Sequence, residues 1–83
     1  SGFVQAVYSH FGYSLPRNSF SQSQVGEAVS YDQAQAGDVI YYGGHVAIYL
    51  GNGMIVHAST QKTGIKTSVA TYRPIITIRH IAH

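Results

Sequence analysis

The chain has 83 residues, 45% of them hydrophobic, with a charged fraction of 10% and a formal net charge of +2. That length suits one small domain, and the composition excludes a disordered protein. The Lys and Arg residues do not cluster, which argues against nucleic-acid binding. Without any Cys, the chain can form neither a disulfide framework nor a Cys-type zinc site, and no apolar run approaches the roughly 18 residues that span a bilayer.

The first third of the sequence is expected to be helical, over residues 1–30. Hydrophobic residues recur at positions 3, 4, 7, 8 and 11, the spacing of one helical face, which predicts an amphipathic helix over 1–12 that stops at Gly12. A loop follows. Ser19 with Gln22 three residues later has the pattern of a capping box, and so predicts a short helix over 19–26.

After Gly37 the pattern changes to that of strands, and we expect a β-sheet over residues 38–83. Five segments indicate strands: 38–42, 45–50, 54–57, 65–69 and 75–81. Gly51-Asn52-Gly53 indicates a hairpin turn between the second and third. Helices followed by strands predict an α+β fold, with N-terminal helices packed on an antiparallel sheet.

Five His residues invite a metal interpretation, which their spacing does not favour. No Cys or carboxylate stands at ligand spacing from any of them, so we expect no metal site. His10, His80 and His83 are interpreted as surface residues. His45 and His57 differ, because each lies at an end of a hairpin whose other residues are almost all apolar.

Whether His45 and His57 share a face depends on the hairpin between them. An odd loop such as 51–53 puts Ala47 opposite His57, so that His45 lies diagonal to His57, about 7–8 Å away. A plain two-residue turn at Asn52-Gly53 would turn His57 to the other face. A His–His pair therefore requires a longer loop or a β-bulge, and the glycines at 51 and 53 permit either.

Two imidazoles on one face suggest a general base and the group that orients it. One His takes a proton from a nucleophile, while the other binds its far ring nitrogen and fixes the tautomer. Within these residues the only candidate nucleophile at a helix start is Ser1, whose ordinary role would be that of a helix N-terminal hydroxyl.

An ordered set of segments resembles the NlpC/P60 cysteine hydrolases, which act on bacterial cell walls. Members of that family carry Asp-Cys-Ser-Gly-Phe at a helix start, then Leu-Pro-Arg, a Gly-Asp strand, and a His-containing hairpin that leads to a second His. The matching segments here are Ser1-Gly2-Phe3-Val4, Leu15-Pro16-Arg17, Ala36-Gly37-Asp38-Val39, His45-Val46-Ala47-Ile48-Tyr49-Leu50-Gly51-Asn52-Gly53 and His57-Ala58.

The resemblance implies a catalytic site without cofactor or metal. It implies that His45 is the general base, that His57 orients it, and that the nucleophilic Cys is the residue just before Ser1, so that residues 1–83 form a partial, single papain-like domain. A Cys there would stand at a helix N-terminus beside an imidazole, the two features that lower a thiol pKa. Ser1, Arg17 and Ser19 match positions near the family's substrate cleft, and Asp38 matches a structural Gly-Asp turn.

The resemblance also implies a substrate and a location. The family cuts peptidoglycan stem peptides, typically between D-γ-glutamyl and a diamino acid, so we expect an exported protein of the periplasm, envelope or exterior. Ser1-Gly2-Phe3 does not begin a signal peptide, and a targeting signal is expected upstream.

Two other functions remain. One is a non-catalytic relative that binds cell-wall peptide in the same cleft; the pair of His residues favours catalysis over it. The other is a small β-hairpin interaction module, against which the helix ahead of the sheet argues.

Overall fold

The computed structural model describes residues 2–16, 18–60 and 64–81. The helices and strands of this part of the chain follow one another as α1 (Gly2–His10), α2 (Ser19–Gln22), β1 (Glu27–Val29), η1 (Tyr31–Gln33), β2 (Val39–Tyr41), β3 (Val46–Gly51), β4 (Met54–Thr60), β5 (Gly64–Val69), η2 (Ala70–Tyr72) and β6 (Thr77–His80). The elements η1 and η2 are single turns of 3-10 helix.

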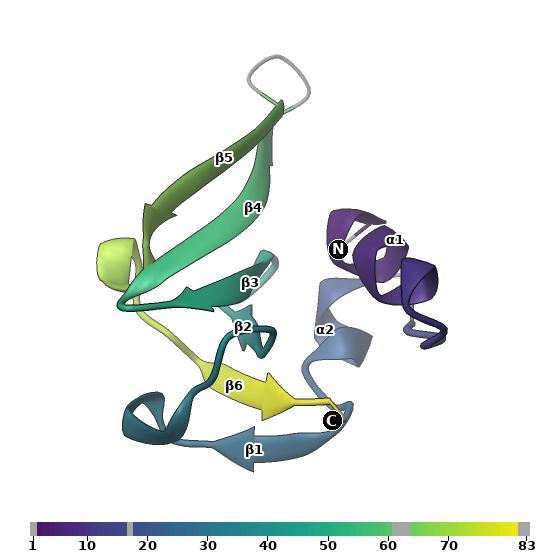
Figure 1. Ribbon diagram of the computed structural model, residues 1–83, viewed down its shortest axis with the longest axis horizontal. Helices are drawn as coiled ribbons and strands as arrows, with labels where there is room; N and C mark the ends of the chain where they lie inside the picture. The colour runs from purple at the N-terminus through teal and green to yellow at the C-terminus, as the bar shows by residue number, and fades with distance from the viewer. Residues whose placement is uncertain (1, 17, 61–63, 82–83) are drawn as a thin grey trace.

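The six strands form one sheet in the order β1-β6-β2-β3-β4-β5. Every neighbouring pair is antiparallel. The strands β2 to β5 are joined by successive hairpins, while β6 returns across the sheet to lie between β1 and β2 (Figure 1). The expected antiparallel sheet is therefore confirmed.

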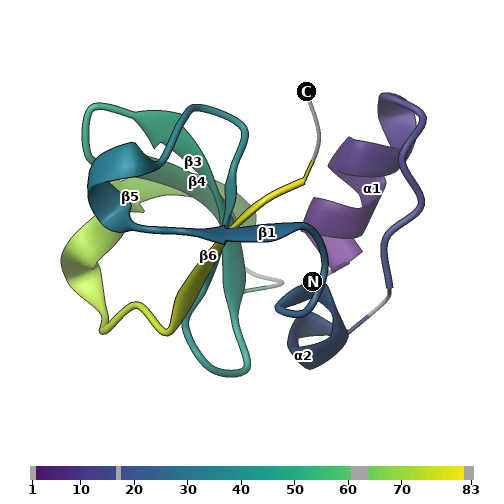
Figure 2. The same ribbon diagram turned by 90° about the horizontal axis from the view of Figure 1, so that it is seen from below.

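Alternation along the strands divides the apolar residues between two cores, one on each face of the sheet. The helix-side core joins α1 and the loop after it to β2 and β3, and consists of Val4, Tyr8, Leu15, Val39, Val46 and Ile48. The far-side core consists of Ile40, Tyr42, Ala47, Tyr49, Ile55, Ala70 and Ile78. Both helices lie on the same side of the sheet in two perpendicular views (Figure 1 and Figure 2).

The first helix has the amphipathic character that the spacing predicts. Val4 and Tyr8 are its buried residues, and they anchor it in the helix-side core. The helix ends at His10, and Gly12 adopts φ of 89°, a left-handed conformation typical of the residue that follows a helix. The predicted packing of a helix on the sheet is thus confirmed for α1, whereas α2 is a single turn of four residues.

The segment between α1 and β2 departs from the sequence prediction. The Oδ1 of Asn18 accepts the backbone N–H of Ser21 at 2.7 Å and caps α2, and Nε2 of Gln22 donates to the carbonyl of Pro16 at 2.7 Å. Residues 27–29, placed in the helical part from sequence, instead pair with β6 as an edge strand.

The turn before β2 is held by the carboxylate of Asp38, which is fully buried. Its Oδ2 accepts the backbone N–H of Gln35 at 2.8 Å, and its Oδ1 lies 2.7 Å from Nδ1 of His80. The structural role predicted for Asp38 is confirmed. The surface position predicted for His80 is wrong, since this side chain links β6 to the turn; His10 is exposed as expected, and His83 lies outside the described residues.

Candidate active site

His45 occupies the last position of the tight turn that joins β2 to β3. The backbone N–H of Tyr42 donates to the carbonyl of His45 at 2.8 Å, which closes the turn around Gly43 and Gly44. These glycines have φ of 86° and 80°, values that suit glycine in a two-residue hairpin turn. A Cβ at Gly43 would also lie 2.9 Å from Cδ1 of Ile76. The turn therefore fixes His45 immediately before β3.

His57 lies within β4, and a β-bulge decides which way it faces. Ile48 pairs with Val56 and Tyr49 with Ile55, but the pairing then shifts, so that Gly51 pairs with Met54 and Leu50 is the extra residue. Regular pairing outward from Gly51 would have put His57 opposite Ile48, whose side chain lies in the helix-side core. With the bulge, His57 follows Ile55 on the far face.

The turn itself is short. Asn52 and Gly53 occupy its two positions with φ of 54° and 77°, so a two-residue turn and a bulge occur together. Of the alternatives that the sequence left open, the bulge is the one adopted.

The rings of His45 and His57 contact each other directly. Nε2 of His45 lies 2.8 Å from Nδ1 of His57, and the ring centroids are 5.0 Å apart at an interplanar angle of 75°. The prediction that both rings share one face is confirmed. The contact uses Nε2 of His45, so Nδ1 is the ring nitrogen of His45 that does not take part in it.

A serine continues the line of hydrogen bonds beyond His57. Nε2 of His57 lies 2.9 Å from Oγ of Ser68, in β5. Ser68 pairs with Ile55 in the sheet and Lys66 pairs with His57, so Ser68 stands diagonal to His57 on the same face. The atoms from His45 to Ser68 thus form one continuous chain.

Burial favours the neutral form of both imidazoles. It is the main reason that the pKa of His45 is lowered from 6.5, with further lowering by His57 and Arg73. Burial also lowers the pKa of His57, with contributions from Lys66 and Arg73. A neutral imidazole can accept a proton, so the pair suits general-base chemistry.

Two tyrosines enclose the pair. The ring of Tyr72 lies 5.4 Å from that of His57 and 5.4 Å from that of Tyr42, which in turn lies 6.2 Å from His45. The hydroxyl of Tyr42 donates to the carbonyl of Ala70 at 2.6 Å, and burial raises the pKa of this phenol. These rings limit access of water to the imidazoles without adding charge.

The first turn of α1 lies close to the strands that carry the pair. The helix contacts both β3 and β4, and Val4 shares the helix-side core with Val46, the residue after His45. At the N-terminus of α1 the helix dipole favours negative charge.

The other predicted site residues cannot be placed relative to the pair. Ser1 and Arg17 lie outside the described residues, and Ser19 begins α2 with a side chain that is not described. Their assignment to a substrate cleft stays a prediction.

Sequence reasoning missed Ser68 and Tyr72 as neighbours of His57. Each is far from His57 in sequence, and only the pairing of β4 with β5 and the 3-10 turn after it bring them close. The polar alternation of β5 was the one available signal, since it marks Lys66 and Ser68 as sharing a face.

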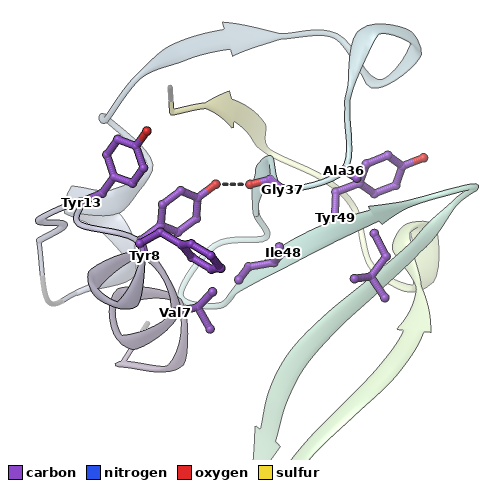
Figure 3. A pocket seen from close by; sticks show the side chains of 9 residues that line it. Val7, Tyr8, Tyr13, Ala36, Gly37, Ile48 and Tyr49 are labelled. Atoms are coloured by element: carbon purple, nitrogen blue, oxygen red, sulfur yellow. Dashed lines mark hydrogen bonds between the residues drawn. The ribbon is translucent and has the colours of Figure 1, made fainter. Parts of the chain in front are cut away.

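A separate pocket lies on the helix side of the sheet (Figure 3). Its volume is about 530 Å³, and it is lined by Val7, Tyr8, Phe11, Tyr13, Ala36, Gly37, Ile48, Tyr49 and Leu50. The hydroxyl of Tyr8 donates to the carbonyl of Gly37 at its edge. Neither His45 nor His57 lines this pocket, so it is distinct from the candidate active site.

The described residues contain no group of three or more His, Cys, Asp or Glu side chains arranged to hold a metal ion. Among the helices of this same part of the chain, none has the length and apolarity needed to cross a membrane.

The sequence model of the NlpC/P60 family matches residues 1–79. The chain belongs to the NlpC/P60 family. It is 40% identical over 75 residues to the murein DD-endopeptidase MepS/murein LD-carboxypeptidase of Escherichia coli, a match covering 83% of this chain and 40% of that protein. It is 32% identical over 79 residues to the gamma-D-glutamyl-L-lysine dipeptidyl-peptidase of Bacillus subtilis, covering 86% of this chain and 26% of that one.

Solved structures of NlpC/P60 domains share the fold. The peptidoglycan hydrolase RipB of Mycobacterium tuberculosis superposes with a TM-score of 0.91 and 32% identity, over 100% of this chain and 44% of that one. RipD of the same organism, described as a non-catalytic NlpC/p60 domain protein adapted to peptidoglycan binding, superposes with a TM-score of 0.86 and 30% identity, over 98% and 64% of the chains. Compared with the two curated relatives above, of which it covers 40% and 26%, the chain spans less than half their length.

Proposed function

We propose that this NlpC/P60 chain carries the histidine half of a cysteine peptidase that hydrolyses peptidoglycan stem peptides. The observation that supports this most is the 2.8 Å contact between Nε2 of His45 and Nδ1 of His57. It holds one imidazole by its far nitrogen and leaves Nδ1 of His45 to take a proton, which is the arrangement that a base in a nucleophilic triad requires.

The proposed nucleophile is a Cys immediately before Ser1. A thiol there would stand at the N-terminus of α1, where the helix dipole stabilises a thiolate, and near the start of β3, where His45 can accept its proton. The family resemblance and the proximity of α1 to β3 support this position. Ser1, Arg17 and Ser19 are proposed to line the cleft beside it.

The reaction would proceed in two stages. The thiolate attacks the carbonyl carbon of the scissile amide, the C–N bond breaks, and the amine leaves with the proton held by His45, which gives a thioester. Water then attacks the thioester while His45 takes its proton; the C–S bond breaks, and a carboxylic acid and the free thiol result. His57 keeps the proton of neutral His45 on Nε2 throughout.

The proposed bond is that between D-γ-glutamyl and the diamino acid of the stem peptide. The name of the Bacillus subtilis relative supports this bond, whereas the name of the Escherichia coli relative indicates a DD bond. The substrate would place the protein in the periplasm, in the cell envelope or outside the cell.

Digestion of defined stem peptides by the full-length protein tests the proposal. We expect mass spectrometry to detect products cut after D-γ-glutamyl, and His45→Ala to abolish them. His10→Ala is the matched control, because His10 is an exposed imidazole in α1. Products cut only between two D-residues would contradict the proposed cleavage site but still support a peptidase.

The second candidate is a peptidoglycan-binding protein without activity. The description of RipD shows that this fold can serve binding alone. The contact between His45 and His57 favours catalysis, since a binding cleft needs no oriented base. Stoichiometric binding of stem peptides without turnover by the full-length protein would establish this alternative.

A further inference from the structure

The candidate site continues past His57 to a residue whose hydroxyl is within hydrogen-bond distance of the ring. Oγ of Ser68 lies 2.9 Å from Nε2 of His57, and Ser68 itself is half-buried in β5. His57 is only 2% exposed, so its Nε2 has little access to water and depends on this partner.

The positions of two protons decide whether His45 can act. Each neutral imidazole carries one N–H, and a single proton lies between Nε2 of His45 and Nδ1 of His57. If His45 carries it, His57 has its own proton on Nε2, which donates to Ser68, and Nδ1 of His45 is a free acceptor. If His57 carries it, Nε2 of His57 accepts from Ser68, and Nδ1 of His45 is protonated and cannot act as a base.

We propose that Ser68 is a positioning residue that accepts a hydrogen bond from Nε2 of His57 and thereby selects the arrangement in which Nδ1 of His45 is a free acceptor. The catalytic consequence rests on the proposed function, whereas the choice of tautomer does not. In this role Ser68 acts through the ring of His57, its hydrogen-bond partner.

The surroundings favour neutral imidazoles, and the reaction then requires one of the two tautomers. Among the residues that the structure describes, Lys66, Arg73, Tyr42 and Tyr72 are the charged or titratable side chains that face the pair. After burial, the positive charges of Lys66 and Arg73 lower the pKa of His57, which favours the neutral ring with one N–H. When His45 becomes protonated during the reaction, its Nε2–H must donate to His57, and only the tautomer with a proton on Nε2 of His57 can receive it.

Replacement of Ser68 by Val or Thr isolates the hydroxyl. The two side chains have nearly the same shape and both suit a strand, so they differ mainly in the ability to accept a hydrogen bond. In the full-length protein, we expect Ser68→Val to lower kcat roughly tenfold with KM within about twofold of wild type, the effect of losing one hydrogen bond. Ser68→Thr should retain kcat within about twofold.

Long-range proton–nitrogen NMR of the imidazoles supplies a readout that a merely structural role would not move. We expect His57 to carry its proton on Nε2 in wild type and Ser68→Thr, and to shift measurably toward Nδ1 in Ser68→Val. Ser68→Ala adds no volume and should match Ser68→Val, which covers the case in which Val disturbs the strand.

Equal kcat and equal tautomers in the Val, Ala and Thr variants would overturn the inference, as would a wild-type His57 protonated on Nδ1. A wild-type protein that hydrolyses no stem peptide would instead refute the proposed function, and the NMR comparison would still decide the role of Ser68.

Discussion

Nε2 of His45 meets Nδ1 of His57 in the register that pairs Tyr49 with Ile55, and a bulge at Leu50 reconciles that register with the two-residue turn at Asn52 and Gly53. Tyr49 pairs with Ile55, and Gly51 pairs with Met54, so that Leu50 has no partner of its own. The half-exposed side chain of Leu50 belongs to neither core. Because Leu50 is the extra residue, the residues of β3 before it pair one position earlier along β4 than regular pairing from the turn would give.

Deletion of Leu50 should therefore preserve the site. Without this residue, Tyr49 and Gly51 become neighbours and the pairing of Tyr49 with Ile55 needs no bulge. We expect nuclear Overhauser contacts between the rings of His45 and His57 to persist. Insertion of one alanine between Ile55 and Val56 is the opposite change, since it turns His57 to the other face, and it should abolish those contacts. Loss of the contacts in the deletion variant would contradict the role given to the bulge.

The two histidines should contribute unequally to the rate. His45→Ala removes the proposed base, and we expect kcat on stem peptides to fall by about a thousandfold or more. His57→Ala should cost less, because an unoriented imidazole still accepts a proton part of the time. Steady-state kinetics of both variants and of the His10→Ala control measure the order. A His57→Ala variant less active than His45→Ala would reverse the assigned roles.

Acid should destabilise the fold through the same pair. The pKa values of His45 and His57 lie below the 6.5 of an unfolded chain, with burial as the main cause. Below about pH 6.5 the unfolded state binds protons that the folded state does not, so the free energy of unfolding falls as the pH drops from 6.5 through the folded-state pKa values. Above 6.5 this contribution is fully present.

Urea denaturation between about pH 7.5 and 5 measures this dependence. The double variant His45→Gln, His57→Gln should lose less stability over the interval than wild type, whereas His10→Gln should follow wild type. Identical pH dependence in the double variant and wild type would show that the pair does not titrate as its burial requires.

The contact between His80 and Asp38 should stabilise the fold independently of the site. His80→Ala removes the 2.7 Å partner of a fully buried carboxylate, which we expect to lower the free energy of unfolding by about 1.5–3 kcal/mol. His10→Ala, on the exposed surface, should change it by less than about 0.5 kcal/mol. A His80→Ala variant as stable as wild type would mean that other groups satisfy the carboxylate.

The β3–β4 hairpin shows what the sequence could predict. The alternation of His45, Ala47 and Tyr49, with glycines at 51 and 53, required a bulge or an odd loop if His57 was to join them, and the bulge is present. Parity along a strand is a local property, so it can be read from neighbouring residues alone.

Other parts of the fold depend on distant partners. Residues 27–29 form a strand only because β6 returns beside them, and three residues carry no periodicity of their own. Ser68 joins His57 through the register of β5, and His80 finds Asp38 across 42 positions of sequence. These contacts are set by tertiary pairing, which local patterns do not encode.

The most direct test of the proposed site is the pH dependence of alkylation of the full-length protein by iodoacetamide, followed by peptide mass spectrometry. We expect the modified residue to be a Cys directly before Ser1, with a midpoint at least one unit below the usual thiol pKa of about 8.5, because the helix N-terminus and His45 stabilise the thiolate. His45→Ala should raise that midpoint toward about 8.5, while His10→Ala should leave it unchanged. Absence of an alkylated Cys at that position, or the same midpoint with and without His45, would contradict the proposal that His45 serves this nucleophile.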